Sequence, residues 1–281
     1  MSDPFDFLGI VEKYVAVDPA SNLYFLIDQG GMPGLYNQLV KSTVEWASLF
    51  GCTREENALA AAPILILVGV GGRLHISKKL LGWIGANARY SSSLIILSSA
   101  LSSKSIERRL TSRFSVKLSE DMGAMLRFFD PRILENLVDV FNAEQAGNFF
   151  SVANIWSFFD RSGNLVKFAA KFNEKDDCNS QLELSQEQES LLLKASEVDQ
   201  VSALLRQNLP EIFNKIPASS RYDYVKSKIN FARMDGLDTV LDFSIYVTVL
   251  MLKGDNIVDA PFWRTFLDGL KKGDLDLCEI S

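Results

Sequence analysis

The most chemically distinctive segment of the chain is Arg127–Arg132, which reads Arg-Phe-Phe-Asp-Pro-Arg. In an extended strand Arg127 and Phe129 would share one face, among apolar neighbours. Burying an arginine without a counter-charge costs roughly several kcal/mol, so a carboxylate is needed, and Asp130 is the local candidate. We expect an ion pair that fixes a strand-to-helix corner. The alternative is that the segment forms a partner-binding surface, and a small share of that alternative is a catalytic site.

Other segments carry weaker chemical signals. Gly69–Gly72 follows an apolar run, as a phosphate-binding loop would, but Leu74 stands where a dinucleotide fingerprint needs glycine and no Lys-Ser/Thr pair follows. The only histidine, His75, has no cysteine or second histidine at metal-ligand spacing. The serine clusters 91–93 and 98–99 lack the G-x-S-x-G pattern of a nucleophile elbow. We expect a plain strand-to-loop exit, a structural or exposed histidine, and serines that belong to loops and strand edges.

The cysteines and the acidic tail add no site. Cys52, Cys178 and Cys278 are odd in number and far apart, which fits neither a disulfide framework nor a CxxC pair and is typical of a reducing compartment. Asp274 and Asp276 lack the spaced carboxylates and glycine of a calcium loop, so a solvated tail is expected. The sequence therefore predicts no catalytic residue, no metal and no cofactor.

Basic residues concentrate between positions 104 and 117. We expect a solvated helix face, because the whole chain is acidic, with 29 Lys and Arg against 35 Asp and Glu and a net charge of −6. A nucleic acid or an acidic protein surface is the alternative partner, but aromatic residues are not interleaved with the charges, and we expect no nucleic-acid binding. The basic residues are Lys104, Arg108, Arg109, Arg113 and Lys117.

The composition is that of a globular protein. Of the 281 residues, 47% are hydrophobic and 23% are charged, which excludes a largely disordered chain and allows one large domain or two modest ones. The longest uncharged run, Asn57–Gly72, is shorter than the ~20 residues that cross a bilayer. The acidic opening lacks the basic start of a secretory signal. We expect a cytoplasmic protein without membrane insertion.

Strand and helix signals are mixed in the first part of the chain. Apolar runs bounded by turn residues predict strands, and apolar residues three and four apart predict helices. Asp130-Pro131 and the pair Asn142 and Gln145 are typical helix starts, and 160–164 is a typical hairpin turn. The predicted strands are 23–27, 64–68, 94–97, 124–129, 155–159 and 165–168, and the predicted helices are 5–14, 35–44, 103–114 and one that begins at 131.

A polar stretch separates this part from the rest. Residues 173–185 contain a charged run and predict a linker. Beyond it the spacing is helical almost throughout, with Gly236 and Gly273 as stop signals. We expect an α/β (α+β) lobe with a mixed sheet over residues 1–172, a linker over 173–185, and an all-helical lobe over 186–281.

The order of motifs resembles a known family, the effector chaperones or adaptors of the bacterial type VI secretion system. The motifs are LYFLID (23–28), APILILVG (62–69), SSALSSKSIERRLTSRFSVKL (98–118), LRFFDPRIL (126–134) and EQAGNFFSVANIW (144–156). The most specific part is the arginine–aromatic–Asp-Pro-Arg core with a later aromatic pair and tryptophan. By position this signature falls on Arg127, Phe129, Asp130, Pro131, Arg132, Phe149, Phe150 and Trp156.

The resemblance implies a cytoplasmic, non-enzymatic adaptor. Such proteins bind a cognate toxic effector and help to load it onto the spike protein at the tip of the secretion tube, without being secreted themselves. The implied partners are a secreted toxin effector and a spike protein, and the signature residues become candidate partner-binding positions. Two rivals are an immunity-type protein that binds and silences a toxin, and a hydrolase that uses carboxylates such as Asp28 and Asp130.

Overall fold

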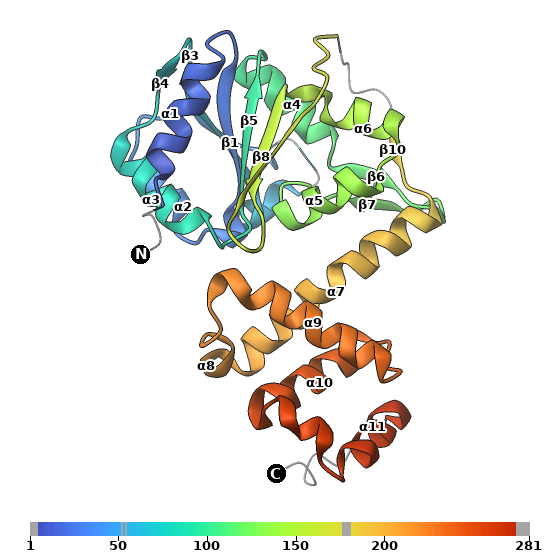
Figure 1. Cartoon of the computed structure of the whole chain (residues 1–281). Coiled ribbons are helices and arrows are strands. Elements are labelled where there is room, and N and C mark those ends of the chain that lie inside the picture. The colour runs from blue at the N-terminus through green and yellow to red at the C-terminus, as the bar shows by residue number, and fades with distance from the viewer. Residues whose placement is uncertain (1–4, 52, 54, 176–180, 274–281) are drawn as a thin grey trace. The chain divides into compact units, whose positions relative to one another are not determined.

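The structure of the protein is a computed structural model that describes residues 5–51, 53, 55–175 and 181–273 (Figure 1). The chain divides into two compact units, residues 1–192 and 193–281. Unit 1 combines helices with two sheets, and unit 2 is all-helical over its described residues. The predicted fold class, an α/β lobe followed by a helical lobe, is confirmed. The three cysteines, Cys52, Cys178 and Cys278, and the acidic residues Asp274 and Asp276 lie outside the described residues.

The main sheet of unit 1 has seven strands, and all its neighbouring pairs are antiparallel. In spatial order they are β2 (Trp46–Ser48), β3 (Pro63–Val70), β1 (Asn22–Asp28), β5 (Leu94–Ser99), β8 (Ile155–Phe159) and β9 (Leu165–Ala169), with β4 (Arg73–Leu74) paired to β3. The strand β1 lies between β3 and β5, and its residues from Leu23 to Asp28 are all buried. Apolar side chains on both faces suit such an interior strand.

Helices cover both faces of this sheet, and each face carries its own apolar core (Figure 1). Because side chains alternate along a strand, Phe25 and Ile27 of β1 enter one core, and Tyr24 and Leu26 enter the other. The first core is covered by α1 (Phe7–Val17), α2 (Leu35–Leu39) and α3 (Lys78–Ala88), and the second by α4 (Ser103–Ser112), α5 (Pro131–Val140) and α6 (Ala143–Phe149). The helix predicted at 35–44 ends earlier, at Leu39.

Local sequence signals place several boundaries as predicted. Asn142 and Gln145 form a reciprocal capping box at the start of α6. In the hairpin between β8 and β9, the Asp160 carboxylate accepts the N–H groups of Ser162 and Asn164, and Gly163 has a φ of +80°. Three short 3-10 segments complete unit 1, at Gln29–Gly31, Glu56–Ala61 and Phe150–Val152.

Unit 1 also contains a second, mixed sheet of three strands. It consists of β10 (Leu182–Glu183), β6 (Ser115–Lys117) and β7 (Gly123–Met125), with β10 parallel to β6 and β7 antiparallel to it. The stretch predicted as a linker, 173–185, thus contributes a strand. The strand predicted at 124–129 is wrong beyond Met125, because Phe128 and Phe129 lie in a turn. Both rings enter the same core, which the alternation of a strand does not permit.

Unit 2 is a helical assembly with its own apolar core. Its helices are α7 (Gln186–Asn208), which begins in unit 1, α8 (Pro210–Phe213), α9 (Arg221–Met234), α10 (Val240–Lys253) and α11 (Trp263–Lys272), with 3-10 turns at Ala218–Ser220 and Asp255–Asp259. Gly236 and Gly273 adopt φ values of +83° and +69° after α9 and α11, as their stop signals predict. Phe243 and Val247 of α10 are fully buried, so this helix is central to the core.

Candidate partner-binding site

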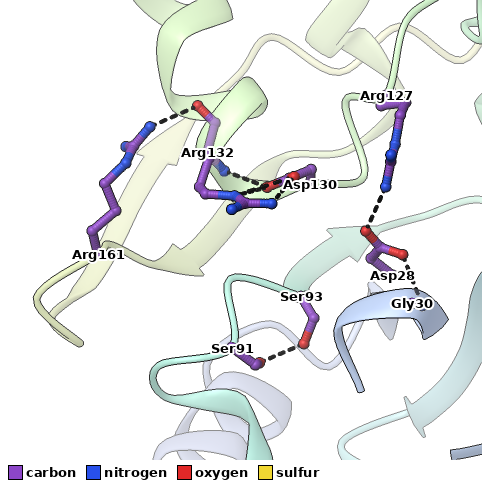
Figure 2. A network of polar contacts seen from close by, with 8 residues as sticks. All are labelled: Asp28, Gly30, Ser91, Ser93, Arg127, Asp130, Arg132 and Arg161. Carbon is purple, nitrogen blue, oxygen red and sulfur yellow. Dashed lines mark hydrogen bonds and ion pairs between the residues drawn. The ribbon is translucent and has the colours of Figure 1, made fainter. Parts of the chain in front are cut away.

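The segment with the family signature forms a turn between β7 and α5 (Figure 2). Asp130 caps α5, since its Oδ1 accepts the backbone N–H of Arg132 at 2.9 Å. The Arg132 guanidinium folds back onto the same carboxylate, with Nη2 2.7 Å from Oδ2 and Nε 3.0 Å from Oδ1. The side chain of Asp130 is only 6% exposed, and that of Arg132 is 38% exposed. The carboxylate of Asp130 is therefore engaged within its own helical turn.

Arg127 pairs with Asp28 and not with Asp130 (Figure 2). Its Nη2 lies 3.0 Å from Oδ2 of Asp28, at the end of β1. The prediction that Asp130 is the partner is wrong, because Arg132 and the helix cap already occupy that carboxylate. The expected burial of Arg127 is also wrong. Its side chain is 52% exposed, since β7 ends before it, and the buried member of the pair is Asp28, at 6%.

Asp28 connects the end of β1 to three neighbouring segments. Its Oδ1 accepts the N–H of Gly30 at 3.0 Å, its backbone N–H donates to the oxygen of Ser93 at 2.8 Å, and its Oδ2 binds Arg127. Burial raises the pKa of Asp28, and Arg127 and the Gly30 N–H oppose that rise. The raised pKa thus has a structural cause. Both carboxylates that a hydrolase would use, Asp28 and Asp130, are held by arginines.

Most of the predicted signature residues lie inside unit 1. The buried ones are Phe129, Asp130, Pro131, Phe149, Phe150 and Trp156. Trp156 packs edge-on against Phe150, with ring centroids 5.5 Å apart, and its Nε1 donates to the backbone oxygen of Phe150 at 3.0 Å. Of the signature, Arg127 and Arg132 alone offer exposed side chains to a partner. The signature therefore builds the fold more than it forms a surface.

Two arginines of the basic segment are also buried, which corrects the predicted solvated face. Arg113, which caps the end of α4, is 8% exposed and donates to the backbone oxygens of Arg109, Asn148 and Phe149, at 2.7, 2.9 and 2.7 Å. Arg109 is 5% exposed and donates to the backbone oxygen of Asn173 at 2.6 Å and to that of Glu174. These bonds tie α4 to the end of α6 and to the segment that follows β9.

The remaining basic residues of this segment stay at the surface. Lys104 and Arg108 are exposed, and Lys117 pairs with Asp121 at 2.7 Å.

The sequence did hold the signal for the two buried arginines. Positions 106, 109, 110 and 113 follow the i, i+3, i+4, i+7 spacing of a buried helical stripe, which includes both arginines with Ile106 and Leu110.

A polar cleft of about 540 Å³ opens beside Arg113 in unit 1. Its walls come from the end of α4, from α6 and from β10, and most of its lining side chains are polar or charged. The charges are mixed, with Glu144 and Glu183 against Arg113 and Lys175, so the cleft gathers no charge of one sign.

The weaker chemical signals resolve as local structure. Gly71 and Gly72 have positive φ values and form the turn between β3 and β4, so the predicted strand-to-loop exit is confirmed. His75 is exposed, as predicted. Ser91 and Ser93 bond to each other through their Oγ atoms at 2.5 Å (Figure 2).

Unit 2 exposes large apolar side chains at one end of a helix pair. Phe231 and Met234, one turn apart on α9, are 51% and 82% exposed. Leu241, near the start of α10, is 64% exposed. Single exposed apolar residues are ordinary, but neighbouring ones mark candidate contact surfaces. Sequence periodicity did not reveal these exposed side chains. It locates the buried face of a helix, but it does not show whether apolar residues on the opposite face contact a partner.

The comparisons with known proteins give one family match. Residues 23–148 match the model of a family described as a domain of unknown function (DUF4123). The match runs from β1 into α6 and lies within the α/β unit. No curated protein and no solved structure matches the chain.

Among the helices in the described ranges, none has both the length and the apolar character to span a membrane. Within the same part of the chain, no three His, Cys, Asp or Glu side chains gather as a metal site would require.

Proposed function

We propose that the protein is a cytoplasmic chaperone or adaptor that binds one type VI secretion effector and promotes its loading onto the spike protein, without catalysing a reaction. The observation that carries the proposal is the motif order that resembles effector adaptors, which falls mainly on the stretch that the DUF4123 match covers. The DUF4123 match at 23–148 contains four of the five motifs on which the resemblance to effector adaptors rests.

The distribution of exposed side chains supports a binding role. An adaptor recognises its partners through exposed surface, and a few anchoring side chains supply most of the binding energy. The signature residues are mainly internal, so contacts to partners come from elsewhere. Unit 2 offers the exposed Phe231 and Met234, and unit 1 ends its main sheet at β9. Two partners require two surfaces, and each unit offers one.

Co-expression with the proteins encoded beside it tests the proposal. The protein should form a stable complex with one effector and should also bind a spike protein, each measured with purified components. If it binds neither, the proposal fails. Binding to the toxin together with protection of cells, and without spike binding, would indicate an immunity-type protein. An activity lost in Asp130→Asn would indicate an enzyme.

A further inference from the structure

The strand β9 ends the main sheet and pairs with β8 alone among the strands that the structure describes. Bonds at both ends of the pair define its phase: Asp160 N–H donates to the Asn164 oxygen at 2.9 Å, and Ala170 N–H donates to the Asn154 oxygen at 2.9 Å. In an antiparallel pair the bonded positions alternate. The backbone groups of residues 166 and 168 therefore face β8.

The intervening residues of β9 direct their backbone groups outward. Leu165, Lys167 and Ala169 each present an N–H and a C=O to the open edge, and their side chains are exposed in the alternating pattern of the strand. Three outward residues in a five-residue strand give a partner strand the bonds of a short ladder. The edge is long enough to be extended.

A hollow of about 170 Å³ lies on the same face of the sheet, beside this edge. Lys167 lines it together with Lys13, Val17, Asp18 and Ile155. Val17 is 73% exposed, so the hollow has an apolar wall open to solvent. The hollow extends from Lys167 toward α1 and β8, so a side chain of an added strand enters it only by extending past Lys167.

Lysine on an edge strand is also a common protection against aggregation. Here the Lys167 Nζ lies 5.4 Å from the ring centroid of Tyr14 on α1, so this side chain extends over the face of the sheet and not along the outward N–H and C=O groups. Antiparallel pairing of two copies around the centre of β9 would bring Lys167 opposite Lys167, which is unfavourable. The lysine therefore disfavours a second copy and favours an acidic partner.

We infer that β9 accepts an extended, acidic segment of a partner protein as an additional strand, with one side chain of that segment entering the hollow beside Lys167. Lys13 and Lys167 provide the complementary charge, against the single carboxylate of Asp18 in the lining. The inference rests on the proposed function, in which the segment belongs to the effector or to the spike protein.

The test removes one outward N–H without touching the pairing with β8. Ala169→Pro eliminates the amide that faces the open edge, whereas Ala169→Thr keeps it with a side chain that strands favour. Binding of the co-encoded effector and of the spike protein is measured for both variants and for Lys167→Glu. We expect Ala169→Pro to weaken one of the two complexes by about tenfold or more and Ala169→Thr by about twofold or less. Lys167→Glu should weaken the same complex.

Hydrogen exchange of the unmodified protein gives an independent result. The amides of Leu165, Lys167 and Ala169 should become protected when the partner binds, and this holds even if Ala169→Pro fails to fold. A partner that binds without protecting these amides, and equally to Ala169→Pro, overturns the inference and leaves the proposed function intact. Binding of neither protein overturns both. A change in self-association alone would assign the edge to a second copy and overturn it as well.

Discussion

Two helices, α4 of unit 1 and α9 of unit 2, bury cations in different ways. In unit 1 the guanidinium of Arg113 donates to backbone oxygens at the end of α6, and that of Arg109 donates to backbone oxygens of the segment after β9. In unit 2 the buried Lys228 places Nζ 2.6 Å from Oδ2 of Asp255, and this carboxylate is 62% exposed. Its Nζ also lies over the ring of Phe231, 5.7 Å from the centroid.

The two arrangements differ in whether water can replace the cation when its side chain is removed. Water reaches the exposed carboxylate of Asp255 if Lys228 is removed, and the carboxylate regains its hydration. The buried oxygen that Arg113 binds on Phe149 has no such replacement, and an unsatisfied buried acceptor costs about 1–3 kcal/mol. The buried arginines of α4 are therefore part of the fold, whereas Lys228 of α9 adds little to it.

The largest expected effect comes from Arg113→Met. The variant leaves the backbone oxygens of Asn148 and Phe149 without their donor, and we expect a loss of about 2–4 kcal/mol in the free energy of unfolding, measured by denaturant titration. Arg108→Met, on the exposed face of the same helix, is the matched control and should change stability by about 0.5 kcal/mol or less. Equal effects of the two variants would show that the bonds of the buried Arg113 to backbone oxygens do not stabilise the fold.

Arg127→Ala should have a smaller and pH-dependent effect. Burial raises the pKa of Asp28 above its ordinary value of 3.8, and without Arg127 the pKa rises further. A group with a raised folded pKa costs stability as the pH rises through that pKa. We expect a loss of about 1 kcal/mol in the free energy of unfolding at neutral pH, a small value because Arg127 is half-exposed. This loss should shrink as the pH falls toward the ordinary pKa of Asp28.

Thermal unfolding at several pH values measures this dependence. The control is Arg127→Ala in an Asp28→Asn background, where the pH dependence of the Arg127 effect should disappear. If Arg127→Ala costs the same at every pH, the ion pair with Asp28 does not account for its role.

Lys228→Met in unit 2 should cost still less. Methionine keeps most of the apolar stem between Tyr224 and Phe231, and Asp255 becomes hydrated. We expect a change of about 0.5 kcal/mol in the free energy of unfolding. A loss as large as that of Arg113→Met would contradict the comparison of the two units.

The smallest effect on stability, combined with an effect on binding, is expected from Met234→Glu. At 82% exposure the side chain contributes little to the core, so stability should stay within about 0.5 kcal/mol. If the exposed end of α9 contacts a partner, a charge there weakens the complex. The control is Met122→Glu, at an exposed methionine of unit 1, and it should leave binding unchanged.

Sequence reasoning succeeded where the determinants are local. The capping box of Asn142 and Gln145 and the hairpin turn at 160–164 depend on residues within five positions of one another, and both are present. Gly236 and Gly273 end their helices for the same reason.

It failed where the partner is distant or is a backbone group. Asp28 and Arg127 are 99 residues apart, so a local search assigned Arg127 to the nearer Asp130. Arg113 donates to backbone oxygens, and because every residue type carries such an oxygen, the sequence does not show which ones it binds. The spacing of the signature aromatics likewise could not distinguish a surface from a core, and the structure places them in the core.

Delivery of effectors by cells that lack this protein tests the central claim most directly. We expect that one cognate effector is no longer delivered while the other effectors are delivered as before, and that the protein restores delivery when it is supplied again. Undiminished delivery of every effector would contradict the claim. Loss of all delivery would also contradict it, because it would make the protein a component of the secretion apparatus and not an adaptor.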